Sequence, residues 1–83
     1  MALYFLEYDL RKQRNYKALY DKLAEFDAVR ILESLWCFKR EQTNAKGLCQ
    51  YFTQFLDGDD GIIVSEVVDW ASWNVQGDPN SLK

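Results

Sequence analysis

The residue types available for chemistry are limited, because the chain contains no histidine. Carboxylates, tyrosine, cysteine and lysine must then carry any catalytic or metal-binding role. Cys37 and Cys49 lack the spacing of a zinc site or a thioredoxin-type pair, so we expect both in the core. Three acids at Asp57, Asp59 and Asp60 superficially suggest a calcium loop. Their spacing lacks the glycine and the distal glutamate of an EF-hand, so a solvated turn is the better interpretation.

A cluster of basic residues is the candidate contact for phosphate, and it consists of Arg11, Lys12, Arg14 and Lys17. The formal net charge of the whole chain is nevertheless −3. Residues 1–47 carry nine Lys or Arg against seven Asp or Glu, whereas residues 48–83 carry one lysine against six acids. This balance argues against a protein that coats nucleic acid, and a solvated loop is the favoured interpretation of the cluster.

Length and composition restrict the class of protein. Eighty-three residues allow one compact domain, and 48% hydrophobic residues exclude intrinsic disorder. The aromatic content of 16% exceeds what a small core can bury, which favours a partner such as a second copy. No apolar run approaches the roughly 18 residues of a membrane span, and the first segment lacks a basic leader. We therefore expect a cytoplasmic protein with reduced cysteines and no membrane partner.

Two amphipathic helices are predicted, one capped by Asn15 and one capped by Thr43 or Asn44. Both are recognised by apolar side chains that recur at helical spacing, with charged or polar residues between them. The apolar stripes are Tyr16, Leu19, Tyr20, Leu23 and Phe26 in the first helix, and Leu48, Phe52, Phe55 and Leu56 in the second.

Three β-rich regions surround the helices, at residues 2–8, 29–40 and 62–68. A straight strand over residues 29–40 would span roughly 40 Å, which is too long for this domain. The region must bend at Glu33-Ser34, giving two strands or one strongly bulged strand. Residues 70–75 can form an edge strand or an arm laid on a partner, and residues 76–83 are predicted to be a frayed tail.

The order strand, helix, strand, strand, helix, strand predicts an α+β, ferredoxin-like domain over residues 1–75. Its four-stranded antiparallel sheet would carry both helices on one face. Alternation in the first strand places Leu3, Phe5, Glu7 and Asp9 on one face, and Tyr4, Leu6 and Tyr8 on the other. Neither face is polar, so we expect the helices to cover one and a second copy of the chain to cover the other.

Three segments resemble a known family. Residues 6–10, Leu-Glu-Tyr-Asp-Leu, and residues 28–36 resemble the small CRISPR adaptation subunits of the Cas-two superfamily, and residues 55–73 are similar to its SinR-like phage and bacterial branch. In those proteins a Tyr-Asp pair ends the first strand, an Arg and a Ser mark the bent second strand, and the dimer forms through the sheets. The matching residues here are Tyr8, Asp9, Arg30 and Ser34.

The resemblance implies a homodimer in which Asp9 of each protomer approaches the two-fold axis and binds a divalent metal. Two such carboxylates repel unless they are protonated or bridged by a hard cation such as Mg²⁺ or Mn²⁺. A metal held there can activate water, which would give a weak endonuclease acting on RNA or DNA in CRISPR or phage biology. The candidate nucleic-acid contacts are Arg11, Lys12, Arg14 and Arg30.

Each of these roles has a plain structural alternative. Asp9 can simply cap the loop that carries Arg11, and Glu7 can be a second metal ligand or an interfacial ion-pair residue. Trp70 and Trp73 can stack on bases, but a dimerisation arm is the favoured interpretation. The competing functional class is a non-catalytic interaction protein, either a structural scaffold or a phage-encoded inhibitor of a bacterial defence complex. Whether the protein is an enzyme stays open.

Overall fold

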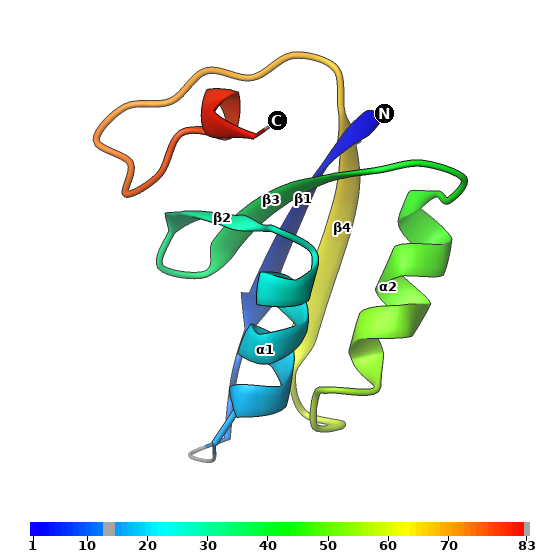
Figure 1. The fold of residues 1–83 in the computed structure, drawn as a ribbon. Coiled ribbons are helices and arrows are strands. Elements are labelled where there is room, and N and C mark those ends of the chain that lie inside the picture. The colour runs from blue at the N-terminus through cyan, green and yellow to red at the C-terminus, as the bar shows by residue number, and fades with distance from the viewer. Residues whose placement is uncertain (13–14, 83) are drawn as a thin grey trace.

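The computed structural model describes residues 1–12 and 15–82, which form a four-stranded antiparallel sheet with two helices on one face (Figure 1). The strand order is β2-β3-β1-β4, and β1 pairs with both β3 and β4. This arrangement confirms the α+β, ferredoxin-like fold. The elements are β1 (Ala2–Asp9), α1 (Lys17–Glu25), β2 (Val29–Leu32), β3 (Leu35–Arg40), α2 (Ala45–Thr53), β4 (Gly61–Val67) and the 3-10 turn η1 (Pro79–Ser81).

The strands β2 and β3 form a hairpin whose two-residue turn is Glu33-Ser34. This confirms the two-strand alternative for residues 29–40. The pairing of β2 with β3 is irregular between Arg30 and Leu32, so the hairpin also bends.

The helix starts follow side-chain hydrogen bonds. The Asn44 Oδ1 atom accepts the Gly47 N–H at 2.8 Å and caps α2 as predicted. At α1 the cap position is Tyr16, and Asn15 lies one residue earlier, where its Oδ1 atom accepts the Lys17 N–H at 2.8 Å. Tyr16 is buried and its hydroxyl donates to Asp60, which ties the start of this helix to a residue 44 positions away in sequence.

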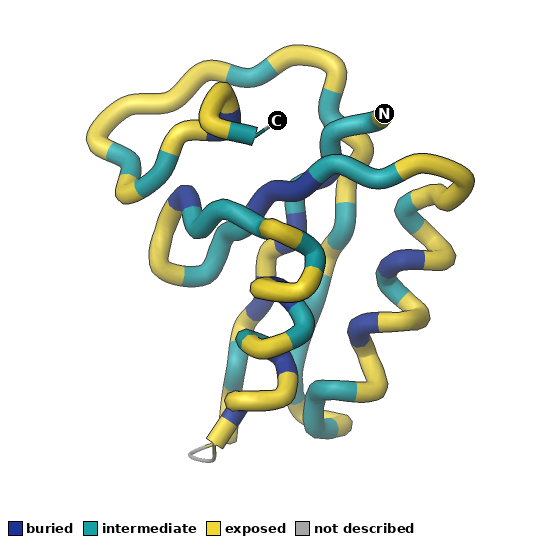
Figure 2. Tube along the Cα trace, in the orientation of Figure 1, coloured by how far each residue is buried: buried dark blue, intermediate teal, exposed yellow. Residues whose placement is uncertain are grey.

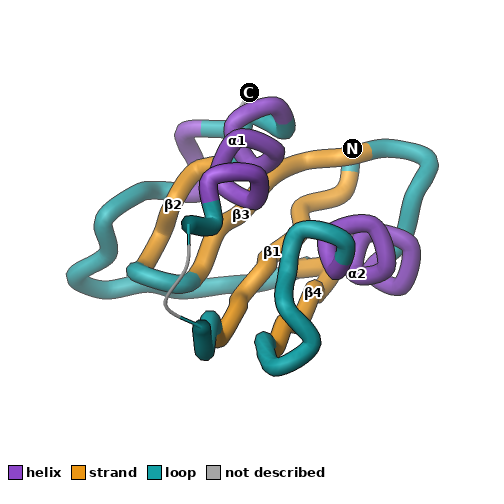
Figure 3. The backbone as a smooth tube through the Cα atoms, turned by 90° about the horizontal axis from the view of Figure 1, so that it is seen from below, coloured by secondary structure: helices purple, strands orange, loops and turns teal. Residues whose placement is uncertain are grey.

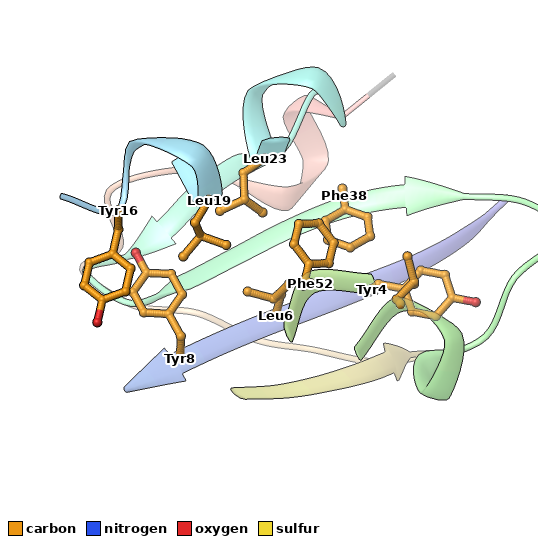
Figure 4. Packing of buried hydrophobic residues seen from close by; sticks show 9 residues of the cluster. Tyr4, Leu6, Tyr8, Tyr16, Leu19, Leu23, Phe38 and Phe52 are labelled. Atoms are coloured by element: carbon orange, nitrogen blue, oxygen red, sulfur yellow. The ribbon is translucent and has the colours of Figure 1, made fainter. Parts of the chain in front are cut away.

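The core lies between the helices and the sheet face that carries Tyr4, Leu6 and Tyr8 (Figures 2 and 4). Alternation in β1 predicted this face correctly. Phe38 from β3 joins the helix residues Leu19, Leu23, Leu48 and Phe52 against it. Burial of each large apolar side chain contributes about 1.5–3 kcal/mol, so the burial of this cluster strongly favours folding.

After β4 the chain crosses the sheet face opposite the helices and wraps around the β2 edge (Figure 3). We call residues 68–82 the strap. The Gln76 N–H donates to the Ile31 carbonyl at 2.7 Å, and Pro79 is buried. Cys37 is fully buried, pairs across the hairpin with Val29, which lies against Gly77 of the strap, and is close enough to Asp78 of the strap to feel its charge. Residues 70–75, expected as an edge strand or a dimer arm, form no strand. Residues 76–83 were expected as a frayed tail, but residues 76–82 pack against the domain. No helix of the described chain is long and apolar enough to span a membrane.

Candidate functional site

Asp9 is the last residue of β1 and points to the face opposite the helices, because it follows Glu7 in the strand alternation. Its side chain is 68% exposed, and its Oδ2 atom accepts the Arg11 Nε–H at 3.0 Å. Asp9 therefore sits where the sequence predicts, at a strand end, and it holds the first cation of the following loop. This geometry agrees with the loop-capping interpretation.

The basic loop is paired with the acidic turn between α2 and β4. Arg11 donates from its Nη1 atom to the Asp59 carbonyl at 2.9 Å, and its backbone N–H donates to Asp60 Oδ1 at 2.8 Å. Lys12 Nζ lies 2.7 Å from Asp59 Oδ2. Two of the cations predicted to contact phosphate thus already have anionic or carbonyl partners. Arg14, also predicted to contact phosphate, lies outside the described residues.

Asp60 organises this end of the molecule, a role that the sequence did not reveal. Its carboxylate accepts the Tyr16 hydroxyl at 2.8 and 2.9 Å and the Asp57 N–H at 2.8 Å, in addition to the Arg11 N–H. Burial raises the pKa of Tyr16, and the hydrogen bond to the Asp60 carboxylate raises it further. The segment expected to be a solvated turn is therefore a hydrogen-bonded anchor. The sequence signal for it was the opposite charge of the two loops, with cations at residues 11–17 and acids at residues 57–60.

The donor set for a metal is incomplete within one protomer. Glu7 and Asp9 line a shallow hollow of about 360 Å³ together with Gly61 and Ile63. Among residues 1–12 and 15–82 there is no group of three or more His, Cys, Asp or Glu side chains that could hold a metal ion. Asp9 also has a guanidinium partner, which competes with a cation for the same oxygen. These residues do not fit a divalent metal site without a second copy.

The other residues that match the family motif gather around the β2–β3 turn. The Tyr8 hydroxyl accepts the Trp36 Nε1–H at 3.1 Å, and the Tyr8 N–H donates to the Ser34 carbonyl at 3.1 Å. Burial raises the pKa of Tyr8, so the hydroxyl stays protonated as a structural group. These contacts tie the turn to the centre of the sheet.

Arg30 closes the same turn. Its Nε and Nη2 atoms donate to the Glu33 carbonyl at 3.0 and 2.6 Å. Its guanidinium also lies 5.2 Å from the Trp36 ring centre and 5.7 Å from that of Tyr20. The predicted nucleic-acid contact Arg30 thus stabilises the hairpin through a forked, stacked geometry.

Three neighbouring hollows lie along the sheet face opposite the helices. The strap hollow, of about 190 Å³, lies between the strap and the sheet, and a middle hollow of about 210 Å³ shares Phe5 and Leu35 with it. The middle hollow shares Glu7 and Ile63 with the hollow beside Asp9. We call the three hollows together the face groove. Its strap end is apolar and its other end is acidic.

Trp70 and Trp73 both line the strap hollow, so the structure brings them to the apolar end of the face groove. Trp70 is half-buried, whereas Trp73 is 85% exposed.

Comparison of the chain with protein-family models, curated proteins and solved structures found no match. The α+β, ferredoxin-like architecture is therefore the class that the structure itself defines, and the functional interpretation depends on these sites.

Proposed function

We propose that this protein is a non-catalytic interaction module that forms a homodimer through the face groove. The observation that carries the proposal is the apolar character of a sheet face that no helix covers. Phe5 and Leu35 are only half-buried there, and Ile63 is 61% exposed. Contiguous apolar surface of this kind is typical of protein interfaces, because its burial against a partner is favourable. Apolar residues that are exposed singly are common on monomers and do not indicate a partner.

Electrostatics favours a protein partner over nucleic acid. The charged side chains that line the face groove are Glu7 and Asp9. Arg11 partly neutralises Asp9, and the remaining negative charge would repel a phosphate backbone. Arg11 and Lys12 engage the acidic turn, and Arg30 engages the hairpin. Beyond a second copy, the partner class that we propose is a protein of a larger complex, which this chain would scaffold or inhibit. A bacterial defence complex is the partner that the family resemblance suggests.

Sedimentation equilibrium of the purified protein tests the proposal. Ile63→Lys places a charge in the middle of the face groove without touching the helix-side core, and we expect it to convert the dimer to a monomer. Gln50→Lys introduces the same charge on the exposed side of α2 and should leave the dimer intact. A wild-type protein that is monomeric at high micromolar concentration would contradict the proposal, as would an Ile63→Lys dimer of unchanged affinity.

A second candidate function is metal-dependent hydrolysis of RNA or DNA, which the resemblance to the Cas-two superfamily implies. The supporting observation is that Glu7 and Asp9 line one hollow of the same face, where a second copy could complete a ligand set. Incubation of single- and double-stranded RNA and DNA with the protein and Mg²⁺ or Mn²⁺, beside Asp9→Ala, tests this function. Cleavage that persists in the variant would remove Asp9 from the mechanism, and absence of cleavage on every substrate would leave the interaction module.

A further inference from the structure

The strap hollow has the size and the lining of a site for one apolar side chain. Its wall contains Phe5, Ile31 and Leu35 from the sheet, with Trp70, Val75 and Pro79 from the strap. Its volume of about 190 Å³ is below the roughly 300–1,000 Å³ of most small-molecule pockets. Apolar walls offer a metabolite few orienting hydrogen bonds, whereas a single large side chain of a protein partner would be desolvated there.

The area that a stable dimer requires brings the strap into the interface. A strip of sheet two strands wide, such as β1 with β4, is about 10 Å across, and the seven residues of β4 make it about 23 Å long. Its flat area is then about 230 Å², whereas a standard interface buries about 800 Å² on each partner. Such a strip alone is too small, so the neighbouring strap surface must contribute.

We propose that Trp73 of each protomer inserts into the strap hollow of the second copy, so that two exchanged indoles anchor the dimer. This inference rests on the proposed homodimer. A two-fold interface uses the same patch on both subunits, which requires a protruding group and a receiving hollow side by side. Trp73 meets this requirement, because it borders the hollow while 85% of it is exposed.

The charge distribution along the face groove favours a two-fold axis at its strap end. Asp9 lies in the hollow at the other end, and Glu7 lies opposite Ile63, between that hollow and the middle one. An axis beside Trp73 carries these carboxylates to opposite ends of the dimer, where they do not repel each other. An axis beside Asp9 would instead place four carboxylates together, with an Arg11 guanidinium beside each Asp9 to offset part of the repulsion. The proposed anchor therefore predicts a different dimer from the one that the family resemblance implies.

Truncation of the indole is the first test. Trp73→Ala should raise the dissociation constant of the dimer at least about 30-fold in sedimentation equilibrium, as for a buried aromatic anchor. Val68→Ala is the matched control, because Val68 is apolar, 95% exposed and on the same strap, yet does not line the hollow. Its dissociation constant should change by less than about threefold. Far-UV circular dichroism and thermal unfolding verify that both variants keep the fold.

Complementation separates the anchor from the dimer itself. Leu35→Trp fills the hollow from β3 but keeps Trp73, whereas Trp73→Ala keeps the hollow but lacks the indole. Each variant alone should associate weakly, and an equal mixture, with one chain isotope-labelled for native mass spectrometry, should form mixed dimers preferentially. The anchor would be overturned if the mixed dimers were no tighter than either homodimer, or if Trp73→Ala dimerised with wild-type affinity. In either case the proposed function would still stand if Ile63→Lys abolishes dimerisation. A monomeric wild type would overturn both.

Discussion

Replacement of Gly77 by alanine should lift the strap off the sheet. An added Cβ atom would lie 2.3 Å from the Arg30 carbonyl oxygen and 2.7 Å from Val29 Cγ1. The carbonyl belongs to β2, which the hairpin holds in place, so the strap must move instead. Its displacement breaks the hydrogen bond from Gln76 to Ile31 and exposes the Cys37 thiol beneath.

The reactivity of Cys37 measures this displacement quantitatively. Burial raises the pKa of the Cys37 thiol from 9.0 to about 11. Because the thiolate is the reactive form, burial lowers its fraction at pH 8 about 100-fold. Labelling with a disulfide reagent at pH 8, in a Cys49→Ser background, should therefore be at least about 100-fold faster in Gly77→Ala than in the parent.

Gly58→Ala is the matched control for this experiment. A Cβ atom at Gly58 meets nothing within 4 Å, and no described glycine has a positive φ, so the substitution carries neither a clash nor backbone strain. Its labelling rate should equal that of the parent. Retention of the far-UV circular dichroism spectrum in Gly77→Ala would show that only the strap has moved. Labelling of Gly77→Ala at the parental rate would refute the reasoning that the strap protects Cys37.

Three further predictions concern stability in urea denaturation. Arg30→Lys keeps the charge but loses the forked contact with the Glu33 carbonyl, so the unfolding free energy should fall by about 1–2 kcal/mol. An unchanged unfolding free energy would contradict the structural role of Arg30 and favour its role as a nucleic-acid contact. Asp60→Ala should cost about 2–3 kcal/mol because several donors lose their acceptor, whereas Asp59→Ala should cost less than about 1 kcal/mol. Between pH 9 and about 11 the unfolded chain releases the Cys37 proton that the folded state retains. As the pH rises through this range, the unfolding free energy of the parent should therefore fall by up to about 3 kcal/mol more than that of Cys37→Ala. Equal losses of unfolding free energy in the two proteins would contradict this prediction.

The fold was predictable because its main determinants are local periodicities. Leu19 and Leu23 recur at helical spacing and are buried, and Tyr4, Leu6 and Tyr8 alternate along β1 onto the core face. The start of α1 was displaced by one residue from the predicted cap. Asn15 is a favourable cap by type, but the bond from Tyr16 to Asp60 connects residues far apart in sequence, and local propensity contains no information about it.

The candidate site was predictable only as a set of residues and not as a set of partners. Asp9, Arg11 and Lys12 lie where the sequence predicts, at the end of β1 and just after it. The hydrogen bonds and ion pairs of Arg11 and Lys12, however, are made with the turn that contains Asp59 and Asp60, and Arg11 in turn pairs with Asp9. That turn is 48 residues away from Arg11 in the chain and reaches it only because β4 lies beside β1. A charge cluster therefore indicates which groups are available, and the sheet order decides whether they neutralise one another.

The strap changes what the surplus of aromatic residues implies. From composition, the apolar sheet face required an external cover, and a second copy was the simplest candidate. In the structure the chain covers part of that face itself, because Gly77 permits close backbone approach and Pro79 is buried at the β2 edge. The surface left for a partner is consequently narrower and off-centre, and it includes the strap that carries Trp73. A dimer centred on Asp9 and one centred on Trp73 therefore bury different residues, and Trp73→Ala distinguishes them more directly than Asp9→Ala.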